Sequence, residues 1–137
     1  MVTGPVPEMV ELAKQMVARS YSPYSRYATG AVLRGANGKL YGGCNVENAA
    51  YPQGTCAEAS AISVMVADGE KRIAEILVIG SGPEIITPCG GCRQRLREFA
   101  ADNTLVHLCD PSGVRRTVTF GELYPMSFGS AHLGAKT

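Results

Sequence analysis

Two short segments of the chain carry residues suited to metal chemistry. One is Cys56-Ala57-Glu58, with a thiol and a carboxylate two residues apart, and the other is Pro88-Cys89-Gly90-Gly91-Cys92, with two thiols at metal-ligand spacing. Thiolates are preferred ligands of Zn²⁺, and a catalytic zinc keeps one position open for water. A carboxylate that does not bind the metal can take a proton from that water. The two segments therefore predict one zinc ion per chain, bound by Cys56, Cys89 and Cys92, with Glu58 as the proton carrier.

Each segment also has a simpler interpretation. Cys89 and Cys92 alone fit half of a structural zinc site, a redox pair or two small buried residues. Thr55 and Glu58 match a helix capping box, in which the glutamate accepts a hydrogen bond from the threonine amide. A fourth ligand, Cys44 or Cys109, would close the metal site and exclude catalysis. The metal interpretation is favoured because both segments open predicted helices, whose first amides stabilise thiolates.

Hydrophobic spacing predicts the elements that position these residues. Helices are expected over 7–19, 55–67 and 89–102, the first with an inward stripe of Met9, Leu12, Ala13, Met16 and Val17. Strands are expected over 27–34, 39–44, 74–80, 105–109 and 114–120, and Asn37-Gly38 predicts a hairpin turn between the first two. Asn103 is expected to cap the third helix, while Arg95 and Arg97 are expected to be solvated. This element order predicts one three-layer α/β domain over residues 1–137 with about five strands.

Two polar or aromatic segments could contribute to binding. Residues 45–54 form a polar loop directly before the Cys56 helix, and binding groups are often found on such loops. A solvated connection is the alternative for this loop. Tyr21, Tyr24 and Tyr27 either cover the core or line a pocket. Gly42 and Gly43 permit close backbone approach, to a neighbouring element or to a ligand.

The composition and charge of the chain argue against a polynucleotide-binding protein, a membrane-spanning protein and a disulfide-rich secreted protein. The chain has 137 residues, a net charge of +1, and no run of Lys or Arg longer than two, so a polynucleotide partner is not expected. No stretch of about 18 apolar residues predicts a membrane span. The start of the chain lacks a secretory pattern, so a cytoplasmic location is expected. The odd number of cysteines, five, favours metal or thiol chemistry over a disulfide framework.

Taken together, these segments resemble the zinc-dependent cytidine deaminases of the small homotetrameric type. The general deaminase signature is a His or Cys, one residue, a Glu, and a later Pro-Cys-x-x-Cys, and Cys56–Glu58 and Pro88–Cys92 match it. The resemblance covers nearly the whole chain, through the segments 23–27, 30–31, 43–49 and 92–94 and through Pro125 and Phe128. It implies an α-β-α sandwich around a central mixed sheet of about five strands.

The same resemblance implies a reaction and a set of substrate contacts. Cytidine and 2′-deoxycytidine would be converted to uridine and 2′-deoxyuridine plus ammonia, in pyrimidine salvage. Hydroxide on the zinc would attack C4, and Glu58 would pass protons to N3 and to the leaving amine. The implied substrate contacts are Asn45 and Glu47 at the ribose hydroxyls, Tyr27 beside the base, the backbone of Ala57 at the pyrimidine, and Tyr51 and Phe128 completing a neighbour's pocket in a homotetramer.

One position departs from the family pattern. Members with three cysteine ligands usually carry Arg immediately after the catalytic glutamate, whereas this chain has Ala59. Three thiolates on Zn²⁺ leave a net charge of about −1, which weakens the ion as a Lewis acid. Another group must offset that charge, and Arg93 is a candidate, with Ser60 as a weaker donor. The departure keeps open two alternatives: a deaminase of another aminopyrimidine nucleoside such as blasticidin S, and a non-catalytic module built around a structural zinc.

Overall fold

A five-stranded sheet forms the middle layer of the protein, a computed structural model in which residues 4–134 are described. Its strands are β1 (Thr29–Gly35), β2 (Leu40–Cys44), β3 (Ile73–Gly80), β4 (Leu105–Asp110) and β5 (Gly113–Thr119). Their spatial order is β2-β1-β3-β4-β5. β3 and β4 run parallel, and the other neighbouring pairs run antiparallel. The prediction of a mixed sheet with about five strands is therefore confirmed.

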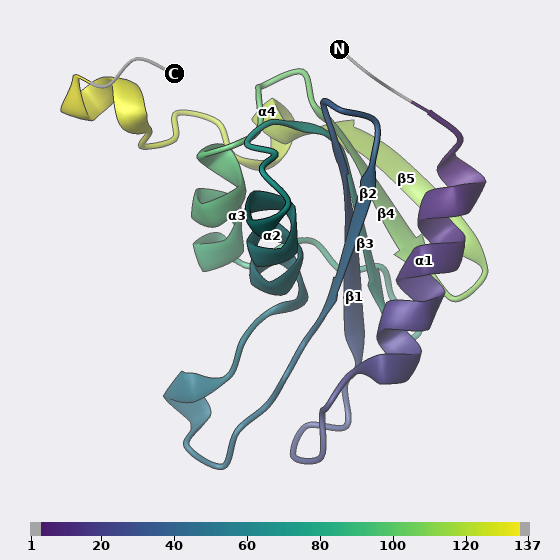
Figure 1. Ribbon diagram of the computed structural model, residues 1–137. Helices are drawn as coiled ribbons and strands as arrows, with labels where there is room; N and C mark the ends of the chain where they lie inside the picture. The colour runs from purple at the N-terminus through teal and green to yellow at the C-terminus, as the bar shows by residue number, and fades with distance from the viewer. Residues whose placement is uncertain (1–3, 135–137) are drawn as a thin grey trace.

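Helices cover both faces of this sheet (Figure 1). α1 (Val6–Arg19) lies on one face, whereas α2 (Ala57–Ala67) and α3 (Gly90–Arg97) lie on the other. The shorter elements are η1 (Tyr51–Gln53), α4 (Phe120–Leu123) and η2 (Ser130–Leu133). Within residues 4–134, no helix is long and apolar enough to cross a membrane. The predicted α-β-α sandwich is confirmed, and so is the order of its elements.

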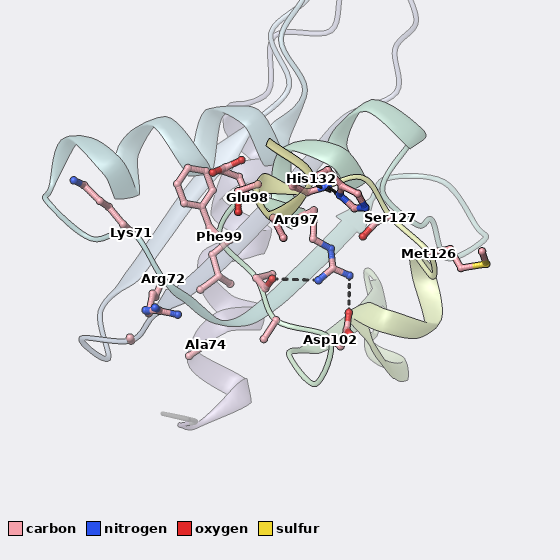
Figure 2. A pocket seen from close by; sticks show the side chains of 17 residues that line it. Lys71, Arg72, Ala74, Arg97, Glu98, Phe99, Asp102, Met126, Ser127 and His132 are labelled. Atoms are coloured by element: carbon pink, nitrogen blue, oxygen red, sulfur yellow. Dashed lines mark hydrogen bonds and ion pairs between the residues drawn. The ribbon is translucent and has the colours of Figure 1, made fainter. Parts of the chain in front are cut away.

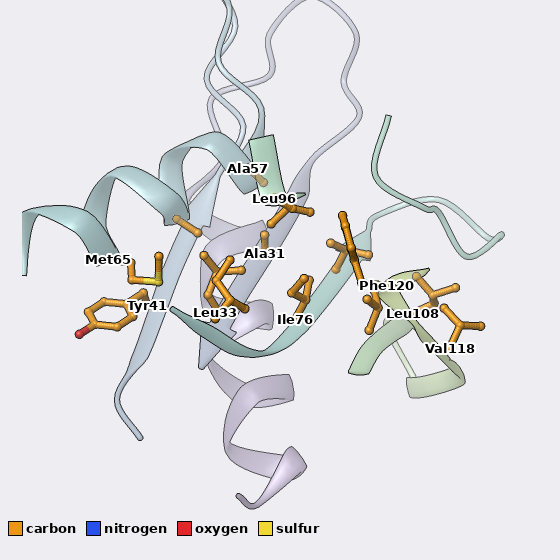
Figure 3. Close-up of a cluster of buried hydrophobic side chains, with 14 residues drawn as sticks. Ala31, Leu33, Tyr41, Ala57, Met65, Ile76, Leu96, Leu108, Val118 and Phe120 are labelled. Carbon is orange, nitrogen blue, oxygen red and sulfur yellow. The ribbon is translucent and has the colours of Figure 1, made fainter. Parts of the chain in front are cut away.

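Two apolar clusters hold the three layers together. The larger cluster lies between the sheet and α2 and α3, and Figure 3 shows Leu33, Ile76 and Leu96 within it. The smaller cluster joins the opposite face to α1 through Met9, Val32 and other side chains. Neighbouring residues of one strand enter different clusters because side chains alternate between the two faces. Every residue of β3 is buried, as predicted for a strand covered on both sides.

The start of α2 is held against the sheet by a close backbone contact at Gly43 on β2. A Cβ added to Gly43 would lie 2.4 Å from the Ala61 nitrogen and 2.5 Å from the Ala57 oxygen. Any side chain would therefore separate β2 from α2. Of the two partners expected for the Gly42-Gly43 pair, a neighbouring element or a ligand, Gly43 approaches the first, the helix α2.

The third predicted helix is shorter than expected. α3 ends at Arg97, with Glu98 as its cap, so the predictions that it reaches residue 102 and ends at Asn103 are wrong. The chain turns early because the Phe99 carbonyl accepts a hydrogen bond from the Ile73 amide at 3.0 Å, at the start of β3. The prediction that Arg97 is solvated is also wrong. Its guanidinium forms an ion pair with Asp102 at 2.7 Å and lies 4.6 Å from the centre of the Phe120 ring.

A buried charged network that was not predicted crosses the α1 face of the sheet. Glu75 on β3 accepts from Arg34 Nε on β1 at 3.0 Å and pairs with His107 Nε2 on β4 at 2.8 Å. The other ring nitrogen of His107 pairs with the Thr117 hydroxyl on β5 at 2.9 Å. Arg34, Glu75 and His107 are each at most 5% exposed. Such groups are tolerated in the interior because each has a charged or hydrogen-bonding partner.

Candidate active site

Three cysteine sulfurs converge where α2 and α3 begin. Cys56 is the N-cap of α2, Cys89 is the N-cap of α3, and Cys92 lies in the first turn of α3. Their sulfur atoms all lie within 4.8 Å of one another. No other His, Cys, Asp or Glu in residues 4–134 joins this group. The fold therefore assembles three potential ligands and leaves a fourth position without a protein ligand from this part of the chain.

The remaining cysteines lie elsewhere. The Cys44 thiol is directed at the Arg19 carbonyl, 3.8 Å away. Cys109 is buried in the cluster beneath α1, on the opposite face of the sheet from α2 and α3. Closure of the site by either residue, which would have excluded catalysis, is not observed.

The donor set fits a zinc ion. Neither helix has a side-chain capping bond at its N-cap, so the positive ends of two helices are directed at the sulfurs. The Cys92 amide lowers the pKa of the Cys89 thiol, whereas burial raises the pKa of the Cys56 and Cys92 thiols. Buried thiols of this kind lose their protons when they coordinate a metal. A soft, three-sulfur donor set selects zinc over hard cations such as Mg²⁺.

Glu58 lies beside the sulfurs in the first turn of α2. Its side chain is buried, with 8% of the residue exposed, and burial is the main cause that raises its pKa. The capping-box interpretation of this residue is wrong, because Cys56 and not Thr55 is the N-cap. The Thr55 amide instead donates to the Val46 carbonyl at 2.8 Å. The capping box therefore does not account for this buried carboxylate.

A pocket of about 410 Å³ opens on the polar loop before α2 and is lined in part by Tyr24, Ser25, Glu47 and Tyr51. The Glu47 carboxylate accepts hydrogen bonds from the amides of Tyr24 at 2.9 Å and Ser25 at 3.1 Å. A further bond from the Ser25 hydroxyl is the largest cause that lowers the pKa of Glu47. Because Val46 pairs with Thr55, the loop that bears Glu47 runs beside the segment entering Cys56.

Asn45 and Tyr27 lie next to this loop. The Asn45 amide group donates to the Tyr27 carbonyl at 2.9 Å, and its oxygen accepts from the Thr29 amide at 2.9 Å. One N–H of the Asn45 side chain is left for a ligand, since a primary amide carries two donors. The Tyr27 ring covers the end of β3, where a Cβ added to Gly80 would lie 2.5 Å from its hydroxyl.

The last two predicted substrate contacts occupy contrasting positions. Ala57 is the first residue of α2 and is 1% exposed, so only its backbone could meet a ligand. Phe128 lies on the segment after α4, stacks on His132 with ring centres 5.2 Å apart, and is 53% exposed. It does not line the 410 Å³ pocket of its own chain.

Two arginines of α3, Arg93 and Arg95, differ in the atoms that they contact. The Arg93 guanidinium donates to the Pro88 carbonyl at 2.8 Å, to the Thr87 hydroxyl at 3.0 Å and to the Leu123 carbonyl. Arg93 therefore binds oxygen atoms and not a ligand sulfur. Arg95 is exposed, as expected for a solvated residue, and its Nη1 also donates to the Cys92 sulfur at 3.6 Å. A side chain three residues after a helical cysteine can reach that sulfur, so the spacing was the available signal.

A second hollow, larger than the 410 Å³ pocket, lies away from the thiols. It encloses about 990 Å³ between the start of β3, the end of α3 and the C-terminal segment (Figure 2). One charged group of its lining, Arg97, is paired with Asp102, as a dashed line in Figure 2 shows. None of the three cysteines or Glu58 lines this hollow, so size alone does not mark the active site.

Comparison with known proteins agrees with this geometry. A family model described as the cytidine and deoxycytidylate deaminase zinc-binding region matches residues 6–108. A cytidine deaminase of Sporosarcina psychrophila is 33% identical over 128 residues, which cover 93% of this chain and 94% of that protein. A cytidine deaminase of Mycobacterium tuberculosis strain H37Rv is 35% identical over 117 residues, covering 85% of this chain and 84% of that protein.

Solved structures extend the comparison to three dimensions. The crystal structure of a cytidine deaminase from Burkholderia pseudomallei superposes with a TM-score of 0.85 at 36% identity, covering 91% of this chain and 100% of that one. The structure of the Mycobacterium tuberculosis enzyme gives a TM-score of 0.81 at 31% identity, covering 93% and 99%. The range that the family model matches, residues 6–108, includes all three clustered cysteines and Glu58. This chain belongs to the cytidine and deoxycytidylate deaminase family.

Proposed function

We propose that this chain hydrolyses cytidine and 2′-deoxycytidine to uridine and 2′-deoxyuridine, releasing ammonia, with one Zn²⁺ bound per chain. The observation that carries this proposal is the convergence of three sulfurs within 4.8 Å beside a buried carboxylate that is not part of the cluster. A structural zinc site would use four protein ligands and would need no such carboxylate. Relatives that match most of the chain are named cytidine deaminases, which supports the same substrate.

Glu58 carries the protons in the proposed reaction. Zinc held by Cys56, Cys89 and Cys92 would supply a Lewis acid and a water molecule of lowered pKa. Glu58 would accept one proton of the attacking water and deliver it to N3 of the pyrimidine. The second proton of the water would reach the amine, which would leave as ammonia when the C4–N4 bond breaks and the oxygen stays on C4. Burial favours the protonated form of Glu58, which is the form that donates to N3.

Recognition of the sugar rests on the polar loop. Glu47 is held by two backbone amides and the Ser25 hydroxyl, and it keeps one acceptor position that can accept from a ribose hydroxyl. Asn45 would add its remaining N–H to the sugar contacts, and Tyr51 would cover the pocket. At the base, Tyr27 would lie beside the ring and the backbone of Ala57 would contact the pyrimidine. Polar groups of this kind discriminate strongly, because a ligand without the matching hydroxyl leaves them unpaired. A nucleoside is therefore expected to bind much better than free cytosine.

A homotetramer is the assembly that we propose. The C-terminal segment extends away from the body of the molecule (Figure 1) and exposes Met126, Phe128 and Leu133. Val64 and Val66 on α2 are also exposed. Contiguous exposed apolar surface is typical of interaction sites, and in the proposed assembly other chains would cover these side chains. In this assembly Phe128 of one chain would complete the pocket of another, and light scattering is expected to give four times the mass of one chain.

The experiment that tests the proposed function compares substrates on purified protein. We expect ammonia release with cytidine and 2′-deoxycytidine, together with about one zinc per chain. Blasticidin S is the control, because it tests the alternative of another aminopyrimidine nucleoside, which the names of the relatives do not favour. Turnover of blasticidin S alone would refute the proposed substrate, and zinc binding without any turnover would favour the non-catalytic module. Within the cell, a cytoplasmic enzyme of pyrimidine salvage is the role that we propose.

A further inference from the structure

The metal centre of this chain carries a charge problem that its three ligands create. Cys56, Cys89 and Cys92 would hold Zn²⁺ as thiolates, so the loaded centre has a net charge of about −1. Cys92 is fully buried, and a buried negative charge is costly unless a positive group or hydrogen-bond donors offset it. The position after Glu58 is Ala59, whose side chain offers no donor.

Arg95 supplies a positive group at the sulfur. Its Nη1 lies 3.6 Å from Cys92 Sγ, within hydrogen-bonding range for sulfur. Arg95 follows Cys92 by three residues on α3, so both side chains lie on neighbouring parts of one helix face. The guanidinium also lies near Gly91, where an added Cβ would make an ordinary contact with Arg95 Nη1 at 3.4 Å.

Other nearby donors are committed elsewhere. The three hydrogen bonds of the Arg93 guanidinium go to oxygen atoms of Pro88, Thr87 and Leu123. The Ser60 hydroxyl donates to the Cys44 carbonyl at 3.0 Å. Among residues 4–134, Arg95 is the arginine or lysine that donates to one of the three clustered sulfurs.

We propose that Arg95 is a positioning residue of the metal centre, whose guanidinium hydrogen-bonds Cys92 and stabilises the zinc-loaded, three-thiolate state. This inference rests on the zinc site of the proposed function, but it does not depend on the substrate. Arg95 acts through sulfur and does not touch the reacting atoms. Partners that contact metal ligands in this way typically change metal affinity by about 10- to 100-fold when removed.

The test uses zinc-loaded protein and follows the transfer of zinc to a chromogenic chelator. Arg95→Ala is expected to release zinc about 10- to 100-fold faster than the unchanged chain. Arg116→Ala is the matched control, because it removes an exposed arginine on β5, and its release rate is expected to be unchanged. Cobalt substitution gives a second readout: without the hydrogen bond, Cys92 is more electron-rich, so the sulfur-to-cobalt absorption band should shift to longer wavelength.

A rescue variant separates charge compensation from a general role in folding. Position 59 follows Cys56 by three residues, the same spacing at which Arg95 follows Cys92. Adding Ala59→Arg to Arg95→Ala is therefore expected to slow zinc release again. The proposal is overturned if Arg95→Ala keeps both the wild-type release rate and the wild-type cobalt spectrum. It is also overturned if the metal-free proteins differ in melting temperature as much as the loaded ones, since Arg95 would then support the fold alone.

These readouts distinguish the inference from the proposed function. Zinc release and the cobalt spectrum are measured without any nucleoside. If the unchanged chain bound zinc but failed to deaminate cytidine, the proposed reaction would be wrong while the role of Arg95 could still be measured. If deamination occurred and Arg95→Ala retained zinc normally, only the inference about Arg95 would fail.

Discussion

Replacing Gly43 with alanine is expected to disturb the active site through the backbone of α2. The new Cβ would lie 2.4 Å from the Ala61 nitrogen, 2.5 Å from the Ala57 oxygen and 2.8 Å from Ser60 Cβ. The two nearest atoms belong to the helix backbone, so no side-chain rotation can relieve the overlap. Ordinary contact begins at 3.4 Å, so β2 and the first turns of α2 must separate by about 1 Å. Cys56 and Glu58 lie at the end of the helix that moves.

The expected losses of stability and of turnover follow from this separation. Overpacking a well-packed contact costs about 1–3 kcal/mol. For a domain of this size, such a loss lowers the melting temperature by about 4–12 °C. A catalytic group displaced by about 1 Å loses activity by about 100-fold. We therefore expect Gly43→Ala to lower turnover more than the loss of stability alone explains.

The assay combines thermal unfolding of the zinc-loaded protein with cytidine-dependent ammonia release at a temperature where both proteins are folded. Gly129→Ala is the matched control, because a Cβ added there meets no atom within 4 Å and its φ of −152° suits alanine. This control is expected to melt as the unchanged chain does. If Gly43→Ala also melted within about 1 °C of the unchanged chain and kept full turnover, the close packing of β2 on α2 would not position the site.

Three further perturbations test other parts of the structure. Glu75→Ala leaves Arg34 and His107 buried without their shared partner. We expect the free energy of unfolding, measured with urea, to fall by about 3–5 kcal/mol. A fall of less than about 1 kcal/mol would argue against a buried network. Burial raises the pKa of Cys109 from 9.0 to about 11, so its contribution to stability is complete below the unfolded value and is lost as the pH rises towards 11. Cys109→Ala should therefore flatten the fall of melting temperature above pH 9.0, and an unchanged slope would contradict this. Cys89→Ala is expected to lose zinc by metal analysis, and full zinc content would show that this thiol is not a ligand.

The sequence was sufficient to predict the order of the elements because each one has a clear local pattern. β3 is an unbroken apolar run, and its residues are buried on both faces as that pattern predicts. The local motif Thr119-x-x-Glu122 is typical of a helix capping box, and the structure has this box with both of its hydrogen bonds. The convergence of three cysteines followed from their residue types and from their expected positions at two helix starts.

Errors arose where tertiary contacts override a local pattern. Thr55 matches the capping motif, but its amide is taken by Val46 in a strand-like bridge, so the helix begins one residue later. α3 ends early because Phe99 bonds across to the start of β3. Both partners in these contacts are distant in sequence or belong to loops, so periodicity carries no signal of them.

The buried network and Arg95 were missed for a different reason. Arg34, Glu75 and His107 are charged or polar residues within apolar strands, which was the signal available in the sequence. Their pairing depends on β1, β3 and β4 being adjacent, and the strand order cannot be deduced from the sequence alone. Arg95 is exposed, as the sequence predicts, but its guanidinium also reaches Cys92, and a charged residue on a helix does not by itself reveal such a contact.

The most direct test of the central claim is the turnover of Glu58→Gln measured together with its zinc content. Glutamine keeps the size of the side chain but cannot carry the proton, and general acid–base catalysis typically contributes about 100- to 10,000-fold. We expect a folded protein with about one zinc per chain and a loss of cytidine deamination of that size. Near-normal ammonia release from this variant would contradict the assignment of Glu58 as the proton carrier.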